Sequence, residues 1–284
     1  MKIIFFGEDS FSNIVLQSLI DAYFDIVLVV SPYYDNLAHK RLEKNCLRNG
    51  IEYIREKDIN SNSLFKKLKL KSPDLIVIAH FEKLIKKNII DLPTNGCINL
   101  HPSLLPNYRG MSPQHWPIIN GESKTGVTVH FVDETADTGD IIIQREIPIY
   151  SDMYVHDLQL KFINIYKTIV VDAIKLLNNN DFIPLKQSHL KGSYYGKLKR
   201  QQCKIDLNKS CIQNYNLIKG VSRPYYGAYI SDLIIWKAHI ATLEEERTID
   251  IIKQNKIGLN YSINKNPYIK LKDGFIIIDK FEKK

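Results

Sequence analysis

The sequence predicts an α/β protein, with a Rossmann-like, doubly wound and mainly parallel sheet followed by a smaller β-rich domain. Apolar runs that suit buried strands alternate with helical patterns through the first half of the 284 residues, which is the arrangement of a doubly wound sheet. The last third instead carries short strand-like runs and a Lys-Asp-Gly hairpin turn at 272–274. We expect a main domain over 1–190, a linker over 191–206 and a small domain over 207–284.

The first half of the chain supplies the strands and helices of this sheet. The opening run KIIFF is followed by the turn GEDS and a helix over 11–20, for which Ser10 is the expected N-cap. The turn contains no G-x-G-x-x-G and carries two acids, so we expect no dinucleotide cofactor. Further strands are expected at 26–30, 51–54 and 75–79, and helices at 38–49, with Leu42, Cys46 and Leu47 inward, and at 60–70.

A short strand, CINL, follows a Pro-Thr-Asn-Gly turn and is followed by His101. The strand and this next residue thus supply two polar side chains that an apolar core does not need. Asn99 and His101 are two residues apart, so their side chains project from the same face of the strand. Pro102 ends the strand and places His101 at its carboxyl end, where open α/β sheets bind ligands. The structural alternative is a satisfied polar pair at a strand end.

Two further strands bring a carboxylate toward this end of the sheet. They are expected at 127–132 and 141–149, joined by the turn Asp137-Thr138-Gly139-Asp140. A neutral His can accept a proton, an Asn N–H can donate to an oxyanion, and a carboxylate favours the imidazolium. This set suits acyl transfer without a covalent enzyme intermediate, and no G-x-S-x-G nucleophile elbow occurs. His130 lies one strand from His101, where it could support the site, but core packing is the role that we favour.

The second half reads as scaffold followed by a β-rich tail. One long helix is predicted over 154–177, with Leu158, Leu160, Ile163, Ile169, Ile174 and Leu177 on its apolar side. A helix at 209–219, strands at 233–240 and 256–263 and a hairpin at 268–281 follow. We expect the hairpin to be exposed and apolar, and therefore a contact of a homodimer.

The motif N-L-H-P-S-L-L-P-x-Y-R-G, followed by G-x-T-x-H and D-T-G-D, resembles the folate-dependent formyltransferases. Members of that family move the formyl group of N10-formyltetrahydrofolate onto an amine. The resemblance implies the formyltransferase fold with a barrel-like C-terminal domain, no metal, and Asn99, His101 and Asp137 as the catalytic residues. It implies that Asn99 donates to the oxyanion, and that Asp137 raises the pKa of His101.

The resemblance also assigns binding residues for both substrates. The formyl donor is expected to contact Phe81, Lys83, Leu84, Ile85, Val132, Asp133, Glu134, Ala136 and Asp137. The segment HFEKLI lacks the glycine that is usual in this loop of the family. The acceptor is expected to contact Ser10, His80, Ser103, Arg109, Met111, Tyr194, Lys197, Arg200 and Tyr226, with a pyrophosphate between Ser10 and the basic segment 191–204.

Three kinds of acceptor occur among the proteins that this chain resembles. The sugar-nucleotide N-formyltransferases carry Pro after the motif His, as at Pro102, and act on an amino-deoxysugar linked to a nucleotide, typically dTDP or UDP. The methionyl-tRNA enzymes are the alternative, but they carry a basic, Gly-rich insertion where this chain has SPYYDNLAHKRLEKN. The glycinamide ribonucleotide enzymes resemble only the first domain. We expect a dTDP-amino sugar, with nucleic acid as the less favoured partner.

Composition adds limits on partners and location. Residues 1–150 hold 17 Lys and Arg against 18 Asp and Glu, a net charge of −1, and residues 151–284 hold 22 against 13, a net charge of +9, so the second half accounts for the +8 of the whole chain. A basic half favours a polyanionic partner, although a Lys-rich composition of the whole chain accounts for it equally well. The four cysteines show no zinc or disulfide spacing, and no apolar run is long enough for a membrane span. We expect free thiols and a cytoplasmic location.

Overall fold

The computed structural model describes residues 1–187, 191–250, 256–261 and 267–283. These residues form two compact units. Unit 1 comprises 1–113, 126–147 and 161–195, and unit 2 comprises 114–125, 148–160 and 196–284. The domain boundaries expected from the sequence, at 190 and 206, remain a prediction. Within the described residues, none of the helices has the length and apolar character needed to cross a bilayer.

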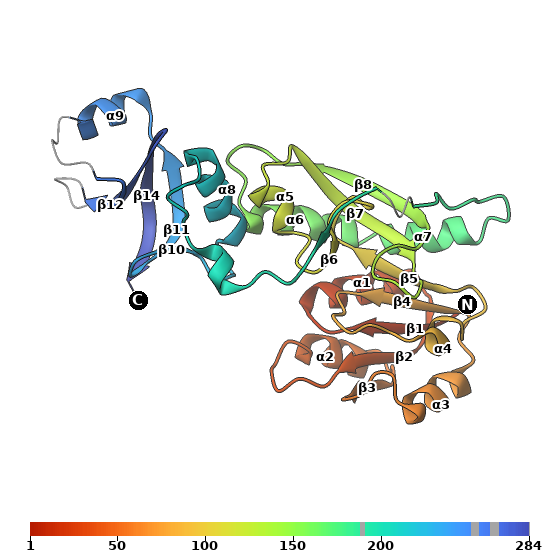
Figure 1. Cartoon of the computed structure of the whole chain (residues 1–284). Coiled ribbons are helices and arrows are strands. Elements are labelled where there is room, and N and C mark those ends of the chain that lie inside the picture. Colours follow the sequence, from red (N-terminus) through yellow and green to blue (C-terminus); the bar gives the residue numbers. More distant parts are fainter. Residues whose placement is uncertain (188–190, 251–255, 262–266, 284) are drawn as a thin grey trace. The chain divides into compact units, whose positions relative to one another are not determined.

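Unit 1 is built on the mixed sheet that the sequence predicts. Seven strands lie in the order β3-β2-β1-β4-β5-β7-β8 (Figure 1). The first five pair in parallel, and β7 pairs antiparallel with β5. The bounds are β1 Lys2–Gly7, β2 Asp25–Pro32, β3 Tyr53–Glu56, β4 Leu75–Ala79, β5 Cys97–His101, β7 Lys124–Phe131 and β8 Ile141–Pro148. The Rossmann-like fold prediction is confirmed.

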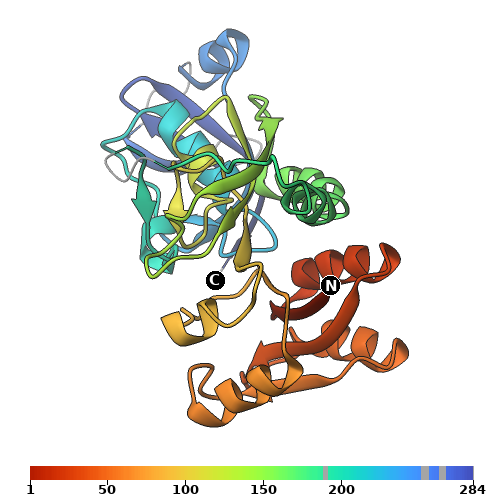
Figure 2. The same ribbon diagram turned by 90° about the vertical axis from the view of Figure 1, so that its right-hand side faces the viewer.

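Helices cover both faces of this sheet, which is why its central strands are apolar on both sides. Ile4 and Phe6 of β1 pack in one core with Leu64 and Leu68 of α3, while Ile3 and Phe5 project to the other face and are fully buried there. Figure 2 shows α1 and α3 on opposite sides of the strands. The helices are α1 Ser10–Asp21, α2 Lys40–Arg48, α3 Asn62–Lys71, α4 Lys87–Ile90, α6 Val155–Tyr166 and α7 Ile169–Leu177.

The strand order places the polar motifs at a topological switch point. From β1 the chain builds the sheet outward through β2 and β3, and then returns to add β4 and β5 on the other side of β1. The loops after β1 and β4 therefore leave adjacent carboxyl ends in opposite directions, which is where open α/β sheets bind ligands. Asn99 and His101 lie at the same edge, on the neighbouring strand β5.

Unit 2 contains the β-rich region that the sequence predicts for the C-terminus. Its antiparallel sheet has the order β10-β11-β14-β13-β12 and packs with α8. The described elements are α5 Trp116–Ile119, a 3₁₀ helix Arg200–Cys203, α8 Cys211–Val221, β10 Ala228–Ile230, β11 Leu233–Ile240, α9 Leu243–Asp250, β12 Gly258–Tyr261, β13 Pro267–Leu271 and β14 Gly274–Lys283. The two-residue strands β6 Arg109–Gly110 and β9 Tyr194–Tyr195 pair in unit 1, so the expected linker contains regular structure.

The structure corrects several local predictions. Asp9, not Ser10, is the N-cap of α1, because its side chain accepts the N–H groups of Phe11 and Ser12. The long helix of 154–177 is two helices that break at 167–168. Leu47 and Leu160 face solvent, with exposed fractions of 81% and 50%. Amphipathic period alone does not decide the edge of an apolar face.

The hairpin expected as a dimer contact is not an exposed apolar surface. Ile269 and Ile276 are fully buried in the core of unit 2, and Tyr268 and Phe275 are 3% and 2% exposed. The apolar face of the hairpin is therefore buried inside unit 2, in one core with residues of α8. The homodimer remains a prediction without this support. Residues 262–263 of the predicted strand at 256–263 lie outside the described residues.

Candidate active site

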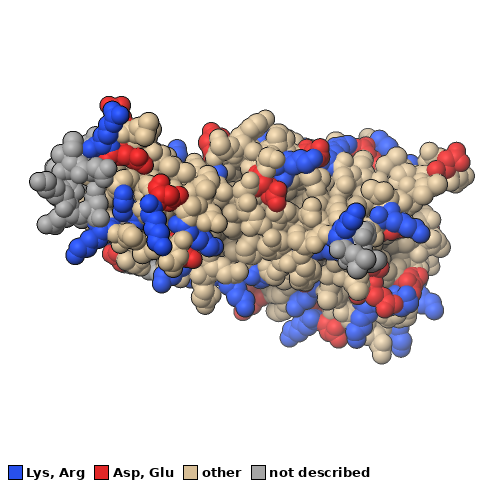
Figure 3. All heavy atoms as spheres, turned by 45° about the horizontal axis from the view of Figure 1, so that its top comes forward, with Lys and Arg blue, Asp and Glu red and all other residues tan. Residues whose placement is uncertain are grey.

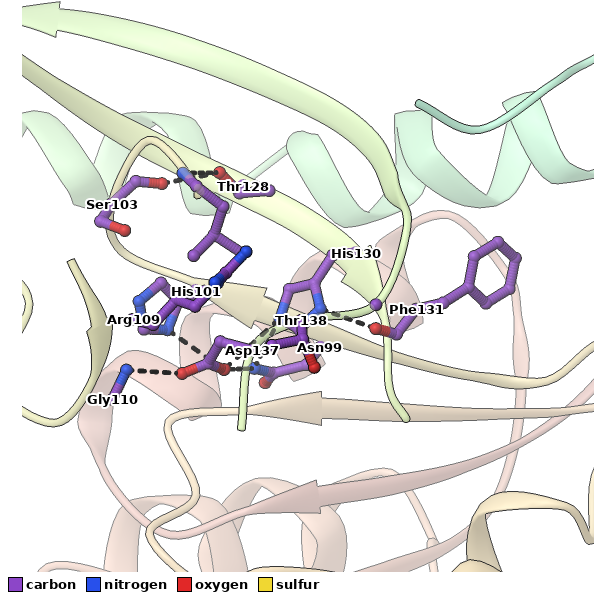
Figure 4. A network of polar contacts seen from close by, with 12 residues as sticks. Asn99, His101, Ser103, Arg109, Gly110, Thr128, His130, Phe131, Asp137 and Thr138 are labelled. Carbon is purple, nitrogen blue, oxygen red and sulfur yellow. Dashed lines mark hydrogen bonds and ion pairs between the residues drawn. The ribbon is translucent and has the colours of Figure 1, made fainter. Parts of the chain in front are cut away.

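Four polar side chains from β5, β7 and the turn after β7 converge at one point of unit 1 (Figure 4). Oδ1 of Asp137 lies 3.5 Å from Nδ1 of His101 and 3.5 Å from Nε2 of His130. Nδ2 of Asn99 donates to the same oxygen over 3.4 Å and lies 3.2 Å from Nε2 of His130. The structure thus brings the three residues predicted to be catalytic into one cluster.

Sheet register explains why His130 belongs to this cluster, against the expectation of core packing. Asn99 lies directly opposite His130 in the antiparallel pair of β5 and β7, and side chains of opposed residues project on the same face of a sheet. The sequence contains both strands but not their register, so the contact between these two residues could not be read from it.

The turn that carries Asp137 is tightly constrained. Asp137 has a φ of 58°, in the left-handed region that costs a non-glycine residue about 1–3 kcal/mol. A Cβ on Gly139 would lie 1.9 Å from the carbonyl oxygen of Phe131, so glycine is required there. Oδ2 of Asp137 accepts the backbone N–H of Gly110 over 2.8 Å. The motifs Y-R-G and D-T-G-D are therefore joined through the carboxylate.

Hydrogen bonding defines the tautomer of His101. Its Nε2 lies 2.8 Å from the carbonyl oxygen of Tyr108, which can only accept, so Nε2 carries the proton. In the neutral imidazole Nδ1 then holds a lone pair, and this nitrogen faces Asp137. His101 can accept a proton at Nδ1, and the imidazolium that forms would donate directly to the carboxylate.

The same argument applies to His130 and Asn99. Nδ1 of His130 donates to the carbonyl oxygen of Phe131 over 2.7 Å, which leaves Nε2 as an acceptor for the amide of Asn99. Both N–H groups of Asn99 are therefore directed at acceptors of the protein, Asp137 and His130. The donor predicted to serve the oxyanion is held in place by these two groups.

Burial and charge set the ionisation of the central pair. Burial lowers the pKa of His101 below its ordinary value, and the Asp137 carboxylate and the Tyr108 carbonyl offset only part of this effect. The expected rise in the pKa of His101 is therefore not the net result. Burial also disfavours the charge on Asp137, but the charge of His101, the contacts from His130 and the N–H of Gly110 outweigh it and hold the pKa of Asp137 below its ordinary value. A neutral imidazole beside a carboxylate is the resting state at neutral pH.

Two cavities of about 390 and 360 Å³ lie beside the loops to which the formyl donor was assigned. The first is lined by Lys87, Ile90, Asp91, Val132, Asp133, Glu134 and Thr135. The second is lined by Asn60, Leu84, Ile85, Lys86, Lys87 and Glu134. They share Lys87 and Glu134, whose side chains form an ion pair at 2.9 Å. Apolar side chains in both cavities fit a flat aromatic ring.

Other residues assigned to the donor lie on the same loops but not all line these cavities. Phe81 packs edge-on against Phe6, with ring centroids 5.4 Å apart. The ammonium of Lys83 lies 5.5 Å from the ring centroid of Tyr34. Ala136 is half-buried in the turn that carries Asp137.

The residues predicted to bind the acceptor belong partly to unit 1 and partly to unit 2. Ser103 is fully buried and donates to the carbonyl oxygen of Asn107, and Arg109 is 8% exposed and donates to Gln187. Both have partners inside unit 1, and their contact with the acceptor remains a prediction. Ser10, Met111 and His80 are half-buried in unit 1, where Tyr194 is 64% exposed. Lys197, Arg200 and Tyr226 are exposed in unit 2.

His80 joins a second polar cluster at the switch point. Its Nδ1 lies 3.4 Å from Oδ2 of Asp9 and its Nε2 lies 2.9 Å from the hydroxyl of Tyr166. The neighbouring Glu8 carboxyl is largely buried, and burial, followed by the charge of Glu82, raises the pKa of Glu8 to about 7. Two carboxyl groups, Glu8 and Asp9, thus lie at the end of β1 beside Ser10, and the pyrophosphate site expected there remains a prediction.

Among the described residues, no group of three or more His, Cys, Asp and Glu side chains is arranged to hold a metal ion. The four cysteines are free and buried. Burial raises the pKa of each thiol, to about 12 for Cys46 and about 11 for Cys203. The thiolate is the reactive form of cysteine. Because the pKa of both thiols is raised, neither Cys46 nor Cys203 is a reactive nucleophile at neutral pH.

Comparison with known proteins identifies the family. Methionyl-tRNA formyltransferase of Ruminiclostridium cellulolyticum is 31% identical, over 99% of this chain and 92% of its own. That of Clostridioides difficile is 34% identical, over 92% of this chain and 88% of its own. The fold is similar to that of WlaRD, a sugar 3N-formyl transferase, with 24% identity, a TM-score of 0.75, and coverage of 100% and 98% of the two chains.

A second solved structure has the same fold over its whole length. The N-formyltransferase of Helicobacter canadensis, determined with folinic acid and dTDP-3-aminofucose, is 23% identical with a TM-score of 0.73, over 99% of this chain and 100% of its own. Residues 1–174 match the family model described as formyl transferase. Together with the identities above 30%, this match shows that the chain belongs to the formyl transferase family, as the resemblance to the folate-dependent formyltransferases predicted.

Proposed function

We propose that this protein transfers the formyl group of N10-formyltetrahydrofolate to the amine of a nucleotide-linked amino-deoxysugar. The observation that carries the formyl-transfer chemistry is the convergence of an amide, an imidazole and a carboxylate within 3.5 Å at the carboxyl end of β5. These three groups can respectively donate to a developing oxyanion, accept a proton and stabilise the resulting cation.

The two cavities support the formyl donor as one substrate. Leu84, Ile85 and Val132 offer apolar contacts for a pterin ring, while Asp133 and Glu134 offer acceptors for its N–H groups. The donor supplies an activated formyl carbon. The protein binds and orients it beside Asp137, which follows the lining residues directly along the chain.

Proton transfer is assigned to His101. An acceptor amine must be neutral to attack and becomes cationic as it does so. Nδ1 of His101 holds the lone pair that takes the proton, Tyr108 fixes the ring through Nε2, and Asp137 stabilises the imidazolium. When the tetrahedral species collapses, the bond from the formyl carbon to N10 breaks and the imidazolium gives the proton to N10, so tetrahydrofolate leaves neutral and His101 is again the free base. Asn99 stabilises the negative charge on the formyl oxygen by redirecting one N–H from its present acceptors, Asp137 and His130.

The short connection between β2 and α2 supports a sugar nucleotide as acceptor. Residues 33–39 form this connection, which leaves no room for the inserted loop expected of a tRNA-binding member. Pro102 after the motif His agrees with the sugar enzymes as well. The acceptor that we favour is dTDP-4-amino-4,6-dideoxyglucose or a dTDP-3-amino sugar, used in the synthesis of a surface polysaccharide.

Methionyl-tRNA is the second candidate, and the sequence relatives favour it. Both relatives compared above carry that name and match this chain across almost its whole length. The basic second half is compatible with RNA. Against it, on the face drawn in Figure 3 the described Lys and Arg side chains are interspersed with Asp and Glu within each unit.

A panel of acceptors decides between the two. Purified protein is incubated with N10-formyltetrahydrofolate and, separately, with dTDP-amino sugars, UDP-amino sugars and methionyl-tRNA, and the formylated product is measured by mass spectrometry. We expect product with a dTDP-amino sugar, and none with the Asp137→Ala variant. Product with methionyl-tRNA alone would overturn the sugar assignment and keep formyl transfer. Absence of product with every acceptor would overturn both.

A further inference from the structure

The side chain of Gln187 makes three hydrogen bonds, two to the backbone of the turn that carries Asp137 and one to Arg109. Its Nε2 donates to the backbone carbonyl oxygens of Asp137, over 3.0 Å, and of Gly139, over 2.7 Å. Its Oε1 accepts from Nη2 of Arg109 over 2.8 Å. The side chain is buried, with 7% exposed. Gln187 lies beyond residue 174, where the family match ends, and no motif of the sequence marked it.

The turn needs external contacts because its conformation is not one that its own sequence favours. Asp137 occupies the left-handed region, which a non-glycine residue leaves unless surrounding groups hold it. Gln187 holds the two backbone carbonyls that flank Thr138. The two bonds fix the planes of the peptide groups Asp137–Thr138 and Gly139–Asp140. The first of these adjoins Asp137, so it limits the direction in which the carboxylate leaves the turn.

Arg109 couples this brace to the other end of the carboxylate. The residue that follows it, Gly110, donates its backbone N–H to Oδ2 of Asp137. Arg109 thus holds Gln187 through its side chain, while its neighbour holds the carboxylate through the backbone. Pairing of β6 with β9 fixes this segment in turn.

We propose that Gln187 is a positioning residue for formyl transfer, which holds the Asp137 carboxylate against Nδ1 of His101. The proposal rests on the proposed function only for its activity assay. Gln187 acts through two N–H donors on the backbone of the turn, and Arg109 serves to orient that amide.

The charged and titratable groups around the pair define what a pH titration measures. His101 faces Asp137 and His130, with His80 as a more distant charge. Asp137 faces His101, His130 and the N–H of Gly110. When the carboxylate moves away from Nδ1, the imidazolium of His101 loses its one nearby anion, so the pKa of His101 falls.

The test uses the full chain with Gln187→Met, which keeps the length of the side chain but removes both donors. Gln144 gives a matched control, because its Nε2 also donates two hydrogen bonds within unit 1, to the carbonyl of Leu105 and to Thr128, but none to the turn. The pKa of His101 is measured by NMR on protein with labelled histidines, with the signal assigned through His101→Asn. Turnover is measured with whichever acceptor the panel identifies.

For Gln187→Met we expect the pKa of His101 to fall by about 0.5 or more, and kcat to fall about tenfold or more with KM for both substrates within about twofold. Gln144→Met should lower Tm comparably and leave the pKa of His101 unchanged. Gln187→Glu, which still pairs with Arg109 but cannot donate to the carbonyls, should also lose turnover.

Two results would overturn the proposal. One is an unchanged pKa of His101 in Gln187→Met, and the other is wild-type turnover in Gln187→Glu. The NMR titration needs no acceptor. It therefore tests the brace even if no acceptor of the panel is formylated, which would count against the proposed function alone.

Discussion

Nδ1 of His101 lies 3.5 Å from Oδ1 of Asp137, and the opposite nitrogen of the same ring lies 2.8 Å from a backbone carbonyl. This relationship gives the imidazole a direction. The nitrogen next to the carboxylate is the one that can accept a proton. The imidazolium that forms is therefore stabilised by the negative charge of Asp137. The predictions below test this arrangement and the groups around it.

Replacing the carboxylate should abolish most of the turnover. Asp137→Asn keeps the shape of the side chain and an oxygen for the N–H of Gly110, but it removes the charge that stabilises the imidazolium. We expect kcat to fall by about 10²–10³. Asp140→Asn, in the same turn, is the control and should change kcat by less than about threefold. Wild-type turnover in Asp137→Asn would remove the carboxylate from the mechanism.

The pH profile of kcat/KM should report His101. Burial lowers the pKa of this imidazole, and its neutral form is the one that accepts a proton, so activity should rise with pH along a limb that lies below about pH 6.5. In Asp137→Asn the residual activity should show this limb at still lower pH, because the imidazolium has lost its anion. The free amine of the acceptor must also be neutral and gives its own limb, which Asp137→Asn does not move. A profile in which no limb moves in Asp137→Asn would contradict the assignment of His101.

His130 should matter for turnover although its position in a strand predicts core packing. His130→Phe fills the same space but offers no acceptor to Asn99 and no nitrogen to Asp137. We expect kcat to fall by about 10- to 100-fold, measured with saturating substrates. Tm should change little, and circular dichroism should confirm the fold. If the variant has the turnover of the wild type, His130 serves only to pack the core and has no role in catalysis.

Glu8 should make the protein less stable as the pH rises. The pKa of this carboxyl is about 7 in the folded protein against 4.5 for the unfolded chain. Between these values the folded state keeps a proton that the unfolded state releases, so the free energy of unfolding falls as the pH rises. Glu8→Gln removes this loss and should gain about 1–3 kcal/mol at pH 8 and nothing near pH 4.5.

The measurement for Glu8 is urea unfolding at the two pH values. Glu122→Gln, at an exposed position, is the control and should show no such difference between them. A Glu8→Gln variant that gains equally at both pH values would show that the gain does not come from the ionisation of Glu8.

The donor cavity can be tested at an exposed leucine. Leu84 lines the second cavity and is 76% exposed, so Leu84→Asp should cost little stability but remove an apolar wall. We expect KM for the formyl donor to rise about tenfold or more, with a smaller change in KM for the acceptor. Leu70→Asp, at a leucine that is 84% exposed on α3 and lines neither cavity, should leave both values unchanged. Equal effects of the two variants would show that the formyl donor does not bind in this cavity.

Sequence patterns were sufficient for the parts of this protein that depend on local chemistry. Apolar runs and turn residues placed most strands of both sheets but not β10. The motifs around Asn99, His101 and Asp137 indicated the family and the catalytic candidates. Helix boundaries were less well determined. The break between α6 and α7 does not interrupt the apolar period, and the N-cap of α1 depends on which of two adjacent polar side chains turns back toward the helix.

Only the tertiary structure determined the contacts between segments that are distant in the chain. The register of β5 against β7 sets His130 opposite Asn99, and the fold brings Gln187 to the turn of Asp137 and Arg109 to Gln187. The fold also buries the apolar face of the C-terminal hairpin in the core of unit 2. Local sequence specifies which backbone conformations are low in free energy and which side chains are chemically reactive. Register and long-range hydrogen bonds depend on the packing of the whole chain, because each is selected by the sum of many weak contacts and not by the residues that it joins.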